Sequence, residues 1–489
     1  MTHYLAIDLG AESGRVIRGT LQQGKLKMQE VHRFPNGAIV ANGTLRWDII
    51  RIFREIRIGV AKGAKGFKIK SIACDSWGVD YVLMKGHGPL LSLPYTYRDD
   101  RTTRTFKQAQ QKVSARQLFS ATGIGSLSIN TLYQLLDDVE KRPELLKFAD
   151  KFLLIGDYIT WLLSGEARAE ETLISGSQCW DTQKRDWARP LLKKLKIPLH
   201  LLPEPIAPGT VVGKVLPYLA KEAGLKNTQV VATCAHDTAS AVVAVPALPG
   251  KDWAYLSSGT WSLLGVELPK PLVNDSVRKA GFTNEVGFAG TTRFLKCLVG
   301  LWILQECRRE WAAKGEVSDY GEITRLAQAA PTLRSLIRPD DSRFSKMGDM
   351  VTKVQAYCRE TQQPIPKTHG EIARCIIESL ALLYRSEMDG LEKLSHRKIT
   401  TLHVVGGGCR NALLNQATAD ATERQVVAGP VEATAAGNIL VQAHALKDVK
   451  GLSHIREIVR KSHRFETYSP RPQPAWKMAH QKFLKLPRS

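Results

Sequence analysis

YLAIDLGAESGRVIRGTL, residues 4–21, contains two apolar runs that are separated by a glycine turn. The first run covers residues 4–9, the turn contains Gly10 and Gly14, and the second run covers residues 15–21. Two apolar runs joined by a short glycine-containing turn are typical of paired strands. We therefore expect the chain to open with a β-hairpin.

A comparable opening recurs half a chain later, where residues 253–268 again read as run, small-residue turn and run. Two such openings in 489 residues favour two related domains, because one hydrophobic core rarely extends over so long a chain. Strand-like runs alternate with segments of helical spacing, which is typical of α/β layers. We expect a first domain over 1–248, a second over 249–448 and a basic tail over 449–489.

The apolar pattern also predicts individual elements. Residues 52–60, 107–146 and 189–195 have apolar side chains at three and four spacing, which predicts helices. Residues 69–74 and 230–232 form short apolar runs, which predict buried strands.

The composition is that of an ordinary globular protein, with 43% hydrophobic and 24% charged residues. No run approaches the roughly 20 apolar residues of a membrane helix, and residues 1–10 lack the pattern of a signal peptide. We expect a cytoplasmic protein without a membrane partner. The eight cysteines are scattered, which favours thiols over a zinc site. Cys358 and Cys375 flank one polar loop, where a disulfide is possible but not required.

The formal net charge of +22 leaves several interpretations open. It fits contact with nucleic acid, contact with a membrane surface, or steering of anionic substrates. The basic residues are dispersed, with the densest stretch after Gly451, and no zinc finger or aromatic RNA-binding signature accompanies them. We interpret the charge as solvation and steering, and we expect no nucleic-acid partner.

The first turn has the chemistry of an anion site. Gly10 and Gly14 let backbone amides turn toward a ligand, while Ser13 adds a hydroxyl donor and Arg15 a fixed positive charge. Asp8, near the end of the first run, is suited to hold Mg²⁺ through water. On these residues alone, a plain hairpin turn is an equal alternative.

Two later turns share this small-residue character. Residues 257–260, SSGT, carry three hydroxyl groups, and residues 402–408, LHVVGGG, end an apolar run in three glycines before a helix predicted over 410–419. Three consecutive glycines are entropically costly, so a ligand lying against the backbone is favoured over a close strand–helix crossing. Such turns are suited to hold a triphosphate, and hairpins without a ligand are the alternative.

Asp237 stands at a strand-to-helix corner in residues 235–241, AHDTASA. A carboxylate there is suited to accept a proton from a hydroxyl group during phosphoryl transfer. It is also suited to cap the helix. Residues 74–80 and 97–101 combine aromatic and short polar side chains, which fits either a sugar site or a surface loop.

The ordered motifs resemble the FGGY family of carbohydrate kinases over nearly the whole chain. They are DLGAESGRV at 8–16, HRFPNG at 32–37, RWD at 46–48, DSWGVDY at 75–81, YRDDRT at 97–102, NTLYQL at 130–135, HDTASAV at 236–242, YLSSGTWSL at 255–263, GLWILQE at 300–306, HVVGGGCRN at 403–411 and GPVEATAAGNI at 429–439. Within the family, the resemblance is greatest to members that phosphorylate L-rhamnulose. It implies an α/β fold of two actin-like (ribonuclease-H-like) domains with an active-site cleft between them.

The resemblance also implies roles for individual residues. Asp237 is the expected catalytic base. The expected sugar contacts are Gly78, His236, Asp237, Thr238 and Cys297. The expected nucleotide contacts are Ala11, Glu12, Ser13, Gly14, Arg15, Thr260, Gln305 and Gly407. ATP and Mg²⁺ are the implied cofactors, with Asp8 on the metal, and a small ketose is the implied phosphoryl acceptor.

Several positions depart from the family's pattern, which usually has Asn at Cys297, Gly at Val286 and Pro at Gly156. The nucleotide motifs and Asp237 are intact, so kinase chemistry is expected. Loss of the Asn amide removes a hydrogen-bond partner for one sugar hydroxyl, which affects discrimination between sugars. The acceptor therefore stays open among L-rhamnulose, fuculose, xylulose and other deoxyketoses. An actin- or chaperone-like switch ATPase, without any phosphoryl acceptor, is a further alternative.

Overall fold

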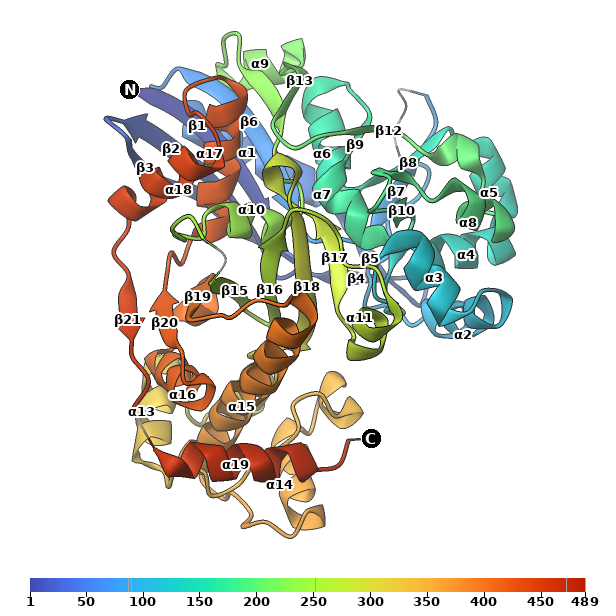
Figure 1. The fold of residues 1–489 in the computed structure, drawn as a ribbon. Coiled ribbons are helices and arrows are strands. Elements are labelled where there is room, and N and C mark those ends of the chain that lie inside the picture. The colour runs from blue at the N-terminus through green and yellow to red at the C-terminus, as the bar shows by residue number, and fades with distance from the viewer. Residues whose placement is uncertain (87, 89, 251, 472, 489) are drawn as a thin grey trace. The chain divides into compact units, whose positions relative to one another are not determined.

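The computed structural model describes residues 1–86, 88, 90–250, 252–471 and 473–488, which form two compact units (Figure 1). The first unit comprises Met1–Leu248, Glu267–Phe294 and Ala433–Ser462, and the second comprises Pro249–Val266, Leu295–Glu432 and His463–Ser489. The domain boundary expected after residue 248 stays a prediction. Two later segments, Glu267–Phe294 and Ala433–Ser462, also belong to the first unit. Within the described part of the chain, no helix combines the length and apolarity needed to cross a membrane.

A six-stranded mixed sheet forms the centre of the first unit, in the order β13-β14-β6-β1-β2-β3. Its strands are β1 (Thr2–Leu9), β2 (Ser13–Gln22), β3 (Lys25–Pro35), β6 (Ile69–Ser76), β13 (Thr210–Lys214) and β14 (Gln229–Ala232). The predicted opening hairpin is confirmed, since β1 and β2 pair antiparallel with Asp8 opposite Arg15. β1 and β6 pair in parallel, which places Asp8 opposite Asp75 at the carboxyl ends of both strands.

Helices cover both faces of this sheet. On α1 (Ile49–Ala64), a Cβ added to Gly59 would lie 2.4 Å from Val16 of β2. On α17 (Ala433–Ala445), Ile439 lies 2.6 Å from the Cβ position of Gly19 on the same strand. Val16 and Gly19 are three residues apart, so they point to opposite faces of the sheet. The two helices therefore cover β2 from opposite sides.

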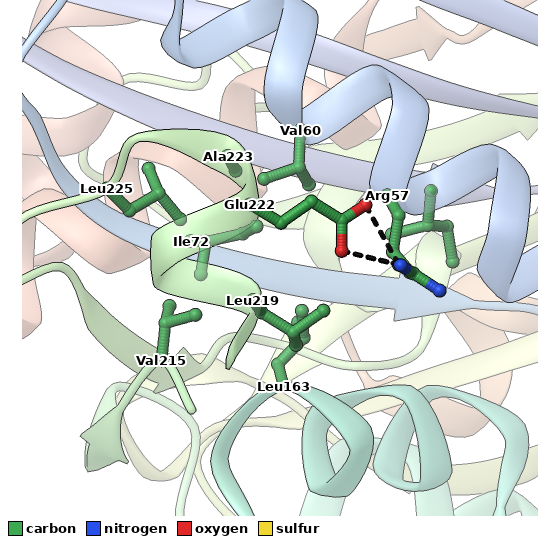
Figure 2. A pocket seen from close by; sticks show the side chains of 10 residues that line it. Arg57, Val60, Ile72, Leu163, Val215, Leu219, Glu222, Ala223 and Leu225 are labelled. Atoms are coloured by element: carbon green, nitrogen blue, oxygen red, sulfur yellow. Dashed lines mark hydrogen bonds and ion pairs between the residues drawn. The ribbon is translucent and has the colours of Figure 1, made fainter. Parts of the chain in front are cut away.

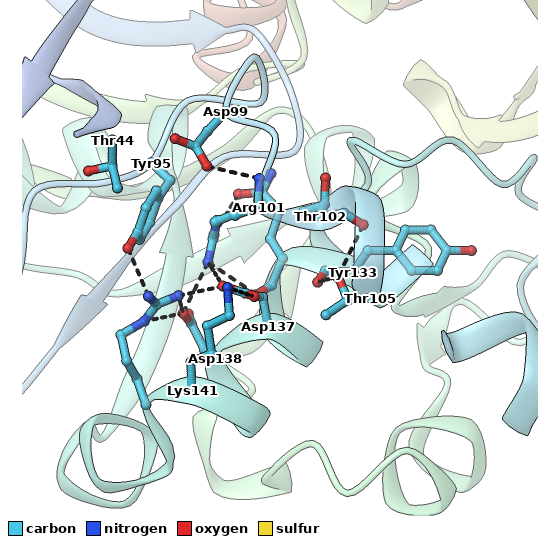
Figure 3. A network of polar contacts seen from close by, with 12 residues as sticks. Thr44, Tyr95, Asp99, Arg101, Thr102, Thr105, Tyr133, Asp137, Asp138 and Lys141 are labelled. Atoms are coloured by element: carbon cyan, nitrogen blue, oxygen red, sulfur yellow. Dashed lines mark hydrogen bonds and ion pairs between the residues drawn. The ribbon is translucent and has the colours of Figure 1, made fainter. Parts of the chain in front are cut away.

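A buried ion-pair network joins the ends of helices in the segment between β7 (Tyr81–Met84) and β8 (Lys151–Leu154) (Figure 3). Asp138, 3% exposed, accepts hydrogen bonds from Arg101 at 3.0 Å and from Arg142 at 2.8 Å, and also from the hydroxyl of Tyr81. The guanidinium carbon of Arg101 also lies 3.9 Å from the centre of the Tyr95 ring. Buried charges need such partners because their desolvation is costly. The helices that the network joins are α2 (Thr102–Lys112), α4 (Thr131–Lys141) and α5 (Pro143–Phe148), and α3 (Ala115–Thr122) lies in the same segment.

The other elements of the first unit surround this frame. Its remaining strands are β4 (Ala38–Ala41), β5 (Thr44–Trp47), β9 (Arg168–Glu170), β10 (Trp180–Asp181), β11 (Asp186–Trp187), β12 (Glu204–Ile206) and β17 (Thr283–Val286). Its remaining helices are α6 (Ile155–Ser164), α7 (Glu171–Ile174), α8 (Arg189–Lys194), α9 (Pro217–Ala223), α10 (Asp237–Val243), α11 (Asp275–Ala280) and α18 (Leu452–Ser462).

The second unit contains the neighbouring strands β16-β15-β19-β20-β21. β15 and β16 pair antiparallel, which confirms the second predicted hairpin, and β15 and β19 pair in parallel with Ser257 opposite Val405. The strands are β15 (Trp253–Ser258), β16 (Trp261–Leu268), β18 (Thr292–Val299), β19 (Thr401–Val405), β20 (Gln425–Ala428) and β21 (Glu466–Tyr468). The helices are α12 (Trp302–Ala313), α13 (Tyr320–Ala329), α14 (Met350–Glu360), α15 (His369–Ser395), α16 (Ala412–Thr422) and α19 (Pro474–Lys485).

The structure also refines local expectations. The helix predicted over 410–419 begins at Ala412, because Arg410 belongs to a 3₁₀ turn and Asn411 caps the helix by accepting from the amide of Leu414 at 3.0 Å. The described residues of the basic tail contain α18, β21 and α19. Cys358 and Cys375 are buried and hydrogen-bonded to each other, which lowers the pKa of the Cys358 thiol.

Candidate active site

The candidate site of the first unit lies where β1 and β6 end beside the loop that precedes α10. The backbone N–H of Trp77 donates to the carbonyl of Leu9 at 3.1 Å, and that of Ser76 donates to the carbonyl of Ala235 at 2.8 Å. These bonds join three segments that are far apart in the sequence. The carboxyl ends of parallel strands are where α/β folds place their ligand-binding residues.

Asp237 is the first residue of α10, and His236 occupies the cap position without capping the helix through its side chain. The helix-cap alternative for Asp237 is therefore wrong. Its Oδ1 accepts from the amide of Thr238 at 2.5 Å and from the Thr238 hydroxyl at 3.1 Å. No hydrogen bond to Oδ2 is formed by the residues that the structure describes, and the side chain is 32% exposed. That oxygen is thus accessible to a substrate.

Gly78 lies beside His236, since a Cβ added to it would be 3.7 Å from the imidazole Nε2. The structure therefore brings together Gly78, His236, Asp237 and Thr238 in the first unit. Cys297 is exposed on the part of β18 that belongs to the second unit. Of the other departing positions, Val286 is buried in the first unit and Gly156 lies close to Ser76, whose Oγ is 3.0 Å from an added Cβ.

Two buried side chains that the sequence reasoning missed contact His236. Arg293 Nη2 lies 3.2 Å from the imidazole Nδ1, and Glu285 Oε2 lies 3.3 Å from the same atom. The same two side chains approach each other to 2.8 Å. Burial opposes ionisation of Glu285, but the charge of Arg293 outweighs it and lowers the pKa of Glu285 to about 2. Glu285 directly precedes Val286, and the sequence pattern indicated only Val286.

Asp75 is a second carboxylate at the site, and its side chain is fully buried. Its Oδ2 accepts a 2.6 Å hydrogen bond from Asn438 of α17, while its Oδ1 has no partner among the described residues. Burial raises the pKa of Asp75 well above its usual range, and the charges of Asp8 and Asp237 raise it further. Asn438 lies in the GPVEATAAGNI motif, to which the sequence assigned no role.

The first glycine turn lies at the same edge. Arg15 donates to Asp8 across the hairpin, and Glu12, whose side chain is 54% exposed, lies 3.8 Å from Arg98. Asn36 stabilises the turn, because its side-chain amide donates to the carbonyl of Gly10 at 2.8 Å and its backbone N–H donates to the carbonyl of Glu12 at 2.9 Å. The turn thus has a fixed shape, with Ala11, Ser13 and Gly14 also in it.

Glu170 holds the backbone beneath His236 and Asp237. Its Oε2 accepts from the amides of Ala235 at 2.9 Å and Leu173 at 3.1 Å, and from the hydroxyl of Thr172 at 2.5 Å. The Thr172 hydroxyl accepts in turn from the amide of His236 at 3.3 Å. Burial raises the pKa of Glu170 to about 7, although these hydrogen bonds oppose the rise.

Asp80 plays a similar part for the loop that carries Gly78. It accepts from the indoles of Trp47 at 2.7 Å and Trp77 at 3.0 Å, from the amide of Tyr97 at 3.1 Å and from Gln134 at 2.9 Å. Burial raises its pKa to about 6 against the effect of these donors. Asp80 thus links the two sequence patterns at residues 74–80 and 97–101 through the amide of Tyr97.

The second unit holds the remaining predicted nucleotide contacts. The carbonyl of Thr260 accepts from the amides of Gly300 at 3.1 Å and Trp302 at 3.3 Å, at the start of α12, and Gln305 lies on that helix. Gly407 follows β19, and no described residue beyond its chain neighbours has an atom within 4 Å of its Cβ position.

The glycine triplet packs closely on β15. A Cβ added to Gly408 would lie 2.1 Å from Ser258 Oγ, which has no hydrogen-bond partner among the described residues. The open space at Gly407 and this buried hydroxyl fit a nucleotide lying against the backbone.

A surface pocket elsewhere in the first unit has a different character (Figure 2). Its lining is mainly apolar, and the ion pair between Arg57 and Glu222 lies at its edge with an N–O distance of 2.5 Å. It contains none of the predicted site residues. It is lined by Ile56, Arg57, Val60, Ile72, Leu163, Val215, Leu219, Glu222, Ala223 and Leu225.

Two family descriptions match the chain over most of its length. The N-terminal domain of the FGGY family of carbohydrate kinases matches residues 3–244, and the C-terminal domain of that family matches residues 254–446. The chain belongs to the FGGY family of carbohydrate kinases. Membership implies that this FGGY chain uses ATP to phosphorylate a sugar, so the switch-ATPase alternative is not supported.

Curated relatives and solved structures agree with this family. The chain is 40% identical over 479 residues to a rhamnulokinase of Bacteroides thetaiotaomicron, covering 98% of each chain. It is 39% identical over 487 residues to a rhamnulokinase of Enterococcus faecalis, covering 99% of this chain and 97% of that one. In fold, it matches a ligand-bound xylulose kinase of Lactobacillus acidophilus with a TM-score of 0.84 at 18% identity, covering 99% and 97% of the two chains. It matches a Plasmodium falciparum glycerol kinase with ADP with a TM-score of 0.80 at 16% identity, covering 99% and 98%. The expected α/β fold of the actin-like sugar kinases is thus confirmed.

Proposed function

We propose that this FGGY chain transfers the γ-phosphoryl group of ATP to L-rhamnulose and forms L-rhamnulose 1-phosphate. The observation that carries the choice of sugar is the identity of about two residues in five to two proteins named rhamnulokinase, over nearly the whole chain. The intact cluster of Gly78, His236, Asp237 and Thr238 supports it, because a ketose needs donors and acceptors next to one carboxylate.

Asp237 is the proposed general base. Its Oδ1 is held by Thr238, so its Oδ2 is oriented to accept the proton of the primary hydroxyl group as that oxygen attacks the phosphorus. Gly78 leaves room for the sugar beside the imidazole of His236. Cys297 is a proposed sugar contact that lacks the amide of the usual Asn.

The phosphate groups need donors, because charge builds up on their oxygens during transfer. In the first unit, the proposed donors are the backbone and side chains of Ala11, Glu12, Ser13, Gly14 and Arg15. In the second unit, we propose that Thr260, Gln305 and Gly407 hold the nucleotide. Transfer requires that the phosphoryl group and the ketose hydroxyl meet.

A magnesium ion is the proposed counter-ion of the phosphates. No three His, Cys, Asp or Glu side chains of the described residues are arranged to hold a metal ion directly. Asp8 and Asp75 lie opposite each other on adjacent strands, and the unpartnered Oδ1 of Asp75 fits an ion that keeps most of its water. When bound, the ion would neutralise phosphate charge.

The test is ADP release from Mg·ATP, measured with a panel of ketoses for the wild type, Asp237→Asn and the control Asp186→Asn. Asp186 is an exposed carboxylate, 53% exposed, that lies outside the site. We expect turnover on L-rhamnulose that falls at least about 100-fold in Asp237→Asn and is unchanged in the control. Preferred turnover on fuculose or xylulose would reassign the sugar, and full activity of Asp237→Asn would refute the base.

A further inference from the structure

The imidazole of His236 is held on its Nδ1 side by a charged pair. Arg293 is fully buried, and its Nη2 donates to Nδ1 at 3.2 Å. Glu285 Oε2 approaches the same Nη2 to 2.8 Å as an ion pair, without the alignment of a hydrogen bond. Glu285 Oε2 also lies 3.3 Å from Nδ1, but it forms no hydrogen bond with the described residues, so Arg293 is the hydrogen-bond partner of Nδ1. A guanidinium group only donates, so Nδ1 accepts in this bond and carries no hydrogen.

The opposite ring atom, Nε2, faces the candidate sugar site. It lies 3.7 Å from the Cβ position of Gly78 and 3.5 Å from Asp237 Oδ1. In a neutral imidazole whose Nδ1 accepts, Nε2 carries the hydrogen and is a donor. The Arg293–Glu285 pair on the Nδ1 side therefore determines that Nε2 is a hydrogen-bond donor toward a ligand on the other side of the ring.

We propose that Arg293 and Glu285 are positioning residues that fix His236 with its hydrogen on Nε2, so that this atom donates to an oxygen of the ketose. This inference rests on the proposed function, because it assumes that the sugar lies beside Gly78. Arg293 fixes the orientation of the ring by donating to Nδ1, and the carboxylate of Glu285 compensates the positive charge of Arg293.

The backbone of the β17–β18 hairpin fixes the pair in place. Arg293 Nε donates to the carbonyl of Val286 at 3.1 Å, and the amide of Val286 donates to Ser175 Oγ at 3.0 Å. Arg293 is therefore held at Nε by a backbone carbonyl, while its Nη2 donates to the imidazole. Lysine has one nitrogen at its end and is unable to make both contacts with this geometry.

The direct test is the tautomer of His236 in the full chain. We would label the histidine rings with ¹⁵N and record long-range ¹H–¹⁵N correlations at neutral pH without substrate, assigning His236 from the signal missing in His236→Gln. We expect an unprotonated Nδ1 and a protonated Nε2. A protonated Nδ1 would overturn the inference, whether or not the protein phosphorylates ketoses. Absence of ketose turnover, with the expected tautomer, would instead refute the proposed function.

Kinetics test the role of the donor. Arg293→Lys and Glu285→Gln are expected to raise the KM for the ketose about tenfold or more, with a smaller change in kcat and an unchanged KM for ATP. Glu267→Gln is the matched control, since Glu267 forms a 2.7 Å, largely buried pair with Arg456 in the same unit and has no imidazole partner among the described residues. Equal losses in all three variants would show a merely structural role and overturn the inference.

His236→Gln and His236→Asn test the contributions of the two ring nitrogens separately. This comparison does not require that the Arg293→Lys variant fold. Gln places its amide nitrogen near the position of Nε2, whereas Asn places its amide near that of Nδ1. We expect Gln to retain a KM for the ketose at least about fivefold lower than Asn does. The reverse order would overturn the inference.

Discussion

Replacing Gly437 by alanine tests whether the packing of α17 sets the position of the proposed base. Gly437 lies on α17 against α10, and a Cβ added to it would lie 1.8 Å from the carbonyl oxygen of Ser240. Real Cβ contacts are essentially never shorter than 3.0 Å, so the helices must separate by about 3.0 − 1.8 = 1.2 Å. Asp237 begins α10, the helix on the other side of this contact.

The expected loss of activity follows from that displacement. Catalytic groups tolerate shifts of about 0.5 Å, and a misplacement of about 1 Å costs on the order of 100-fold in rate. Overpacking costs about 1–3 kcal/mol, and the better helix propensity of alanine returns about 1 kcal/mol. We therefore expect Gly437→Ala to lower kcat on the order of 100-fold and the free energy of unfolding by up to roughly 2 kcal/mol.

Coupled ADP release and urea unfolding measure the two quantities. Gly321→Ala is the control, because Gly321 is an exposed glycine on α13 whose added Cβ meets only the end of the Asp319 side chain at 3.0 Å. The control should keep its activity and lose no stability, because alanine has the better helix propensity. Wild-type kcat and stability in Gly437→Ala would refute the reasoning, whereas lost stability with full kcat would show that the helix shift does not reach Asp237.

Three further outcomes follow from the same geometry. The pKa of Glu170 rises from 4.5 to about 7 on folding, so its contribution to stability falls by roughly 3 kcal/mol as pH rises through that window. Urea unfolding across this range should show that Glu170→Gln removes this slope, and an unchanged slope would contradict the assignment. Asp80→Asn turns the NH₂ of an amide toward some of the four donors around it. We therefore expect the free energy of unfolding in urea to fall by about 2–4 kcal/mol and the KM for the ketose to rise. Wild-type values of both would be evidence against this role. Gly408→Ala places a Cβ 2.1 Å from Ser258 Oγ and should raise the KM for ATP about tenfold without changing that for the ketose, and an effect on the ketose alone would contradict a nucleotide site there.

The sequence by itself determined the local features of this protein. The two hairpins, the strand at 69–74 and the helix at 52–60 follow from apolar periodicity and turn glycines, which act between residues close in the chain. The order of the motifs was enough to identify the family. The sequence also indicated Asp237 as a carboxylate at a strand-to-helix corner, but left its role open between base and cap.

Only the tertiary structure decided which distant side chains support those features. Asn438 reaches Asp75 across 363 residues, and Arg293 reaches His236 across 57. No spacing rule predicts such pairs, because sheet order and helix packing set them, and both depend on the whole chain. The same holds for Gly437, which looks like a weak helix residue in the sequence. Its role is visible only where α17 meets α10, since the contact that excludes a side chain belongs to another helix.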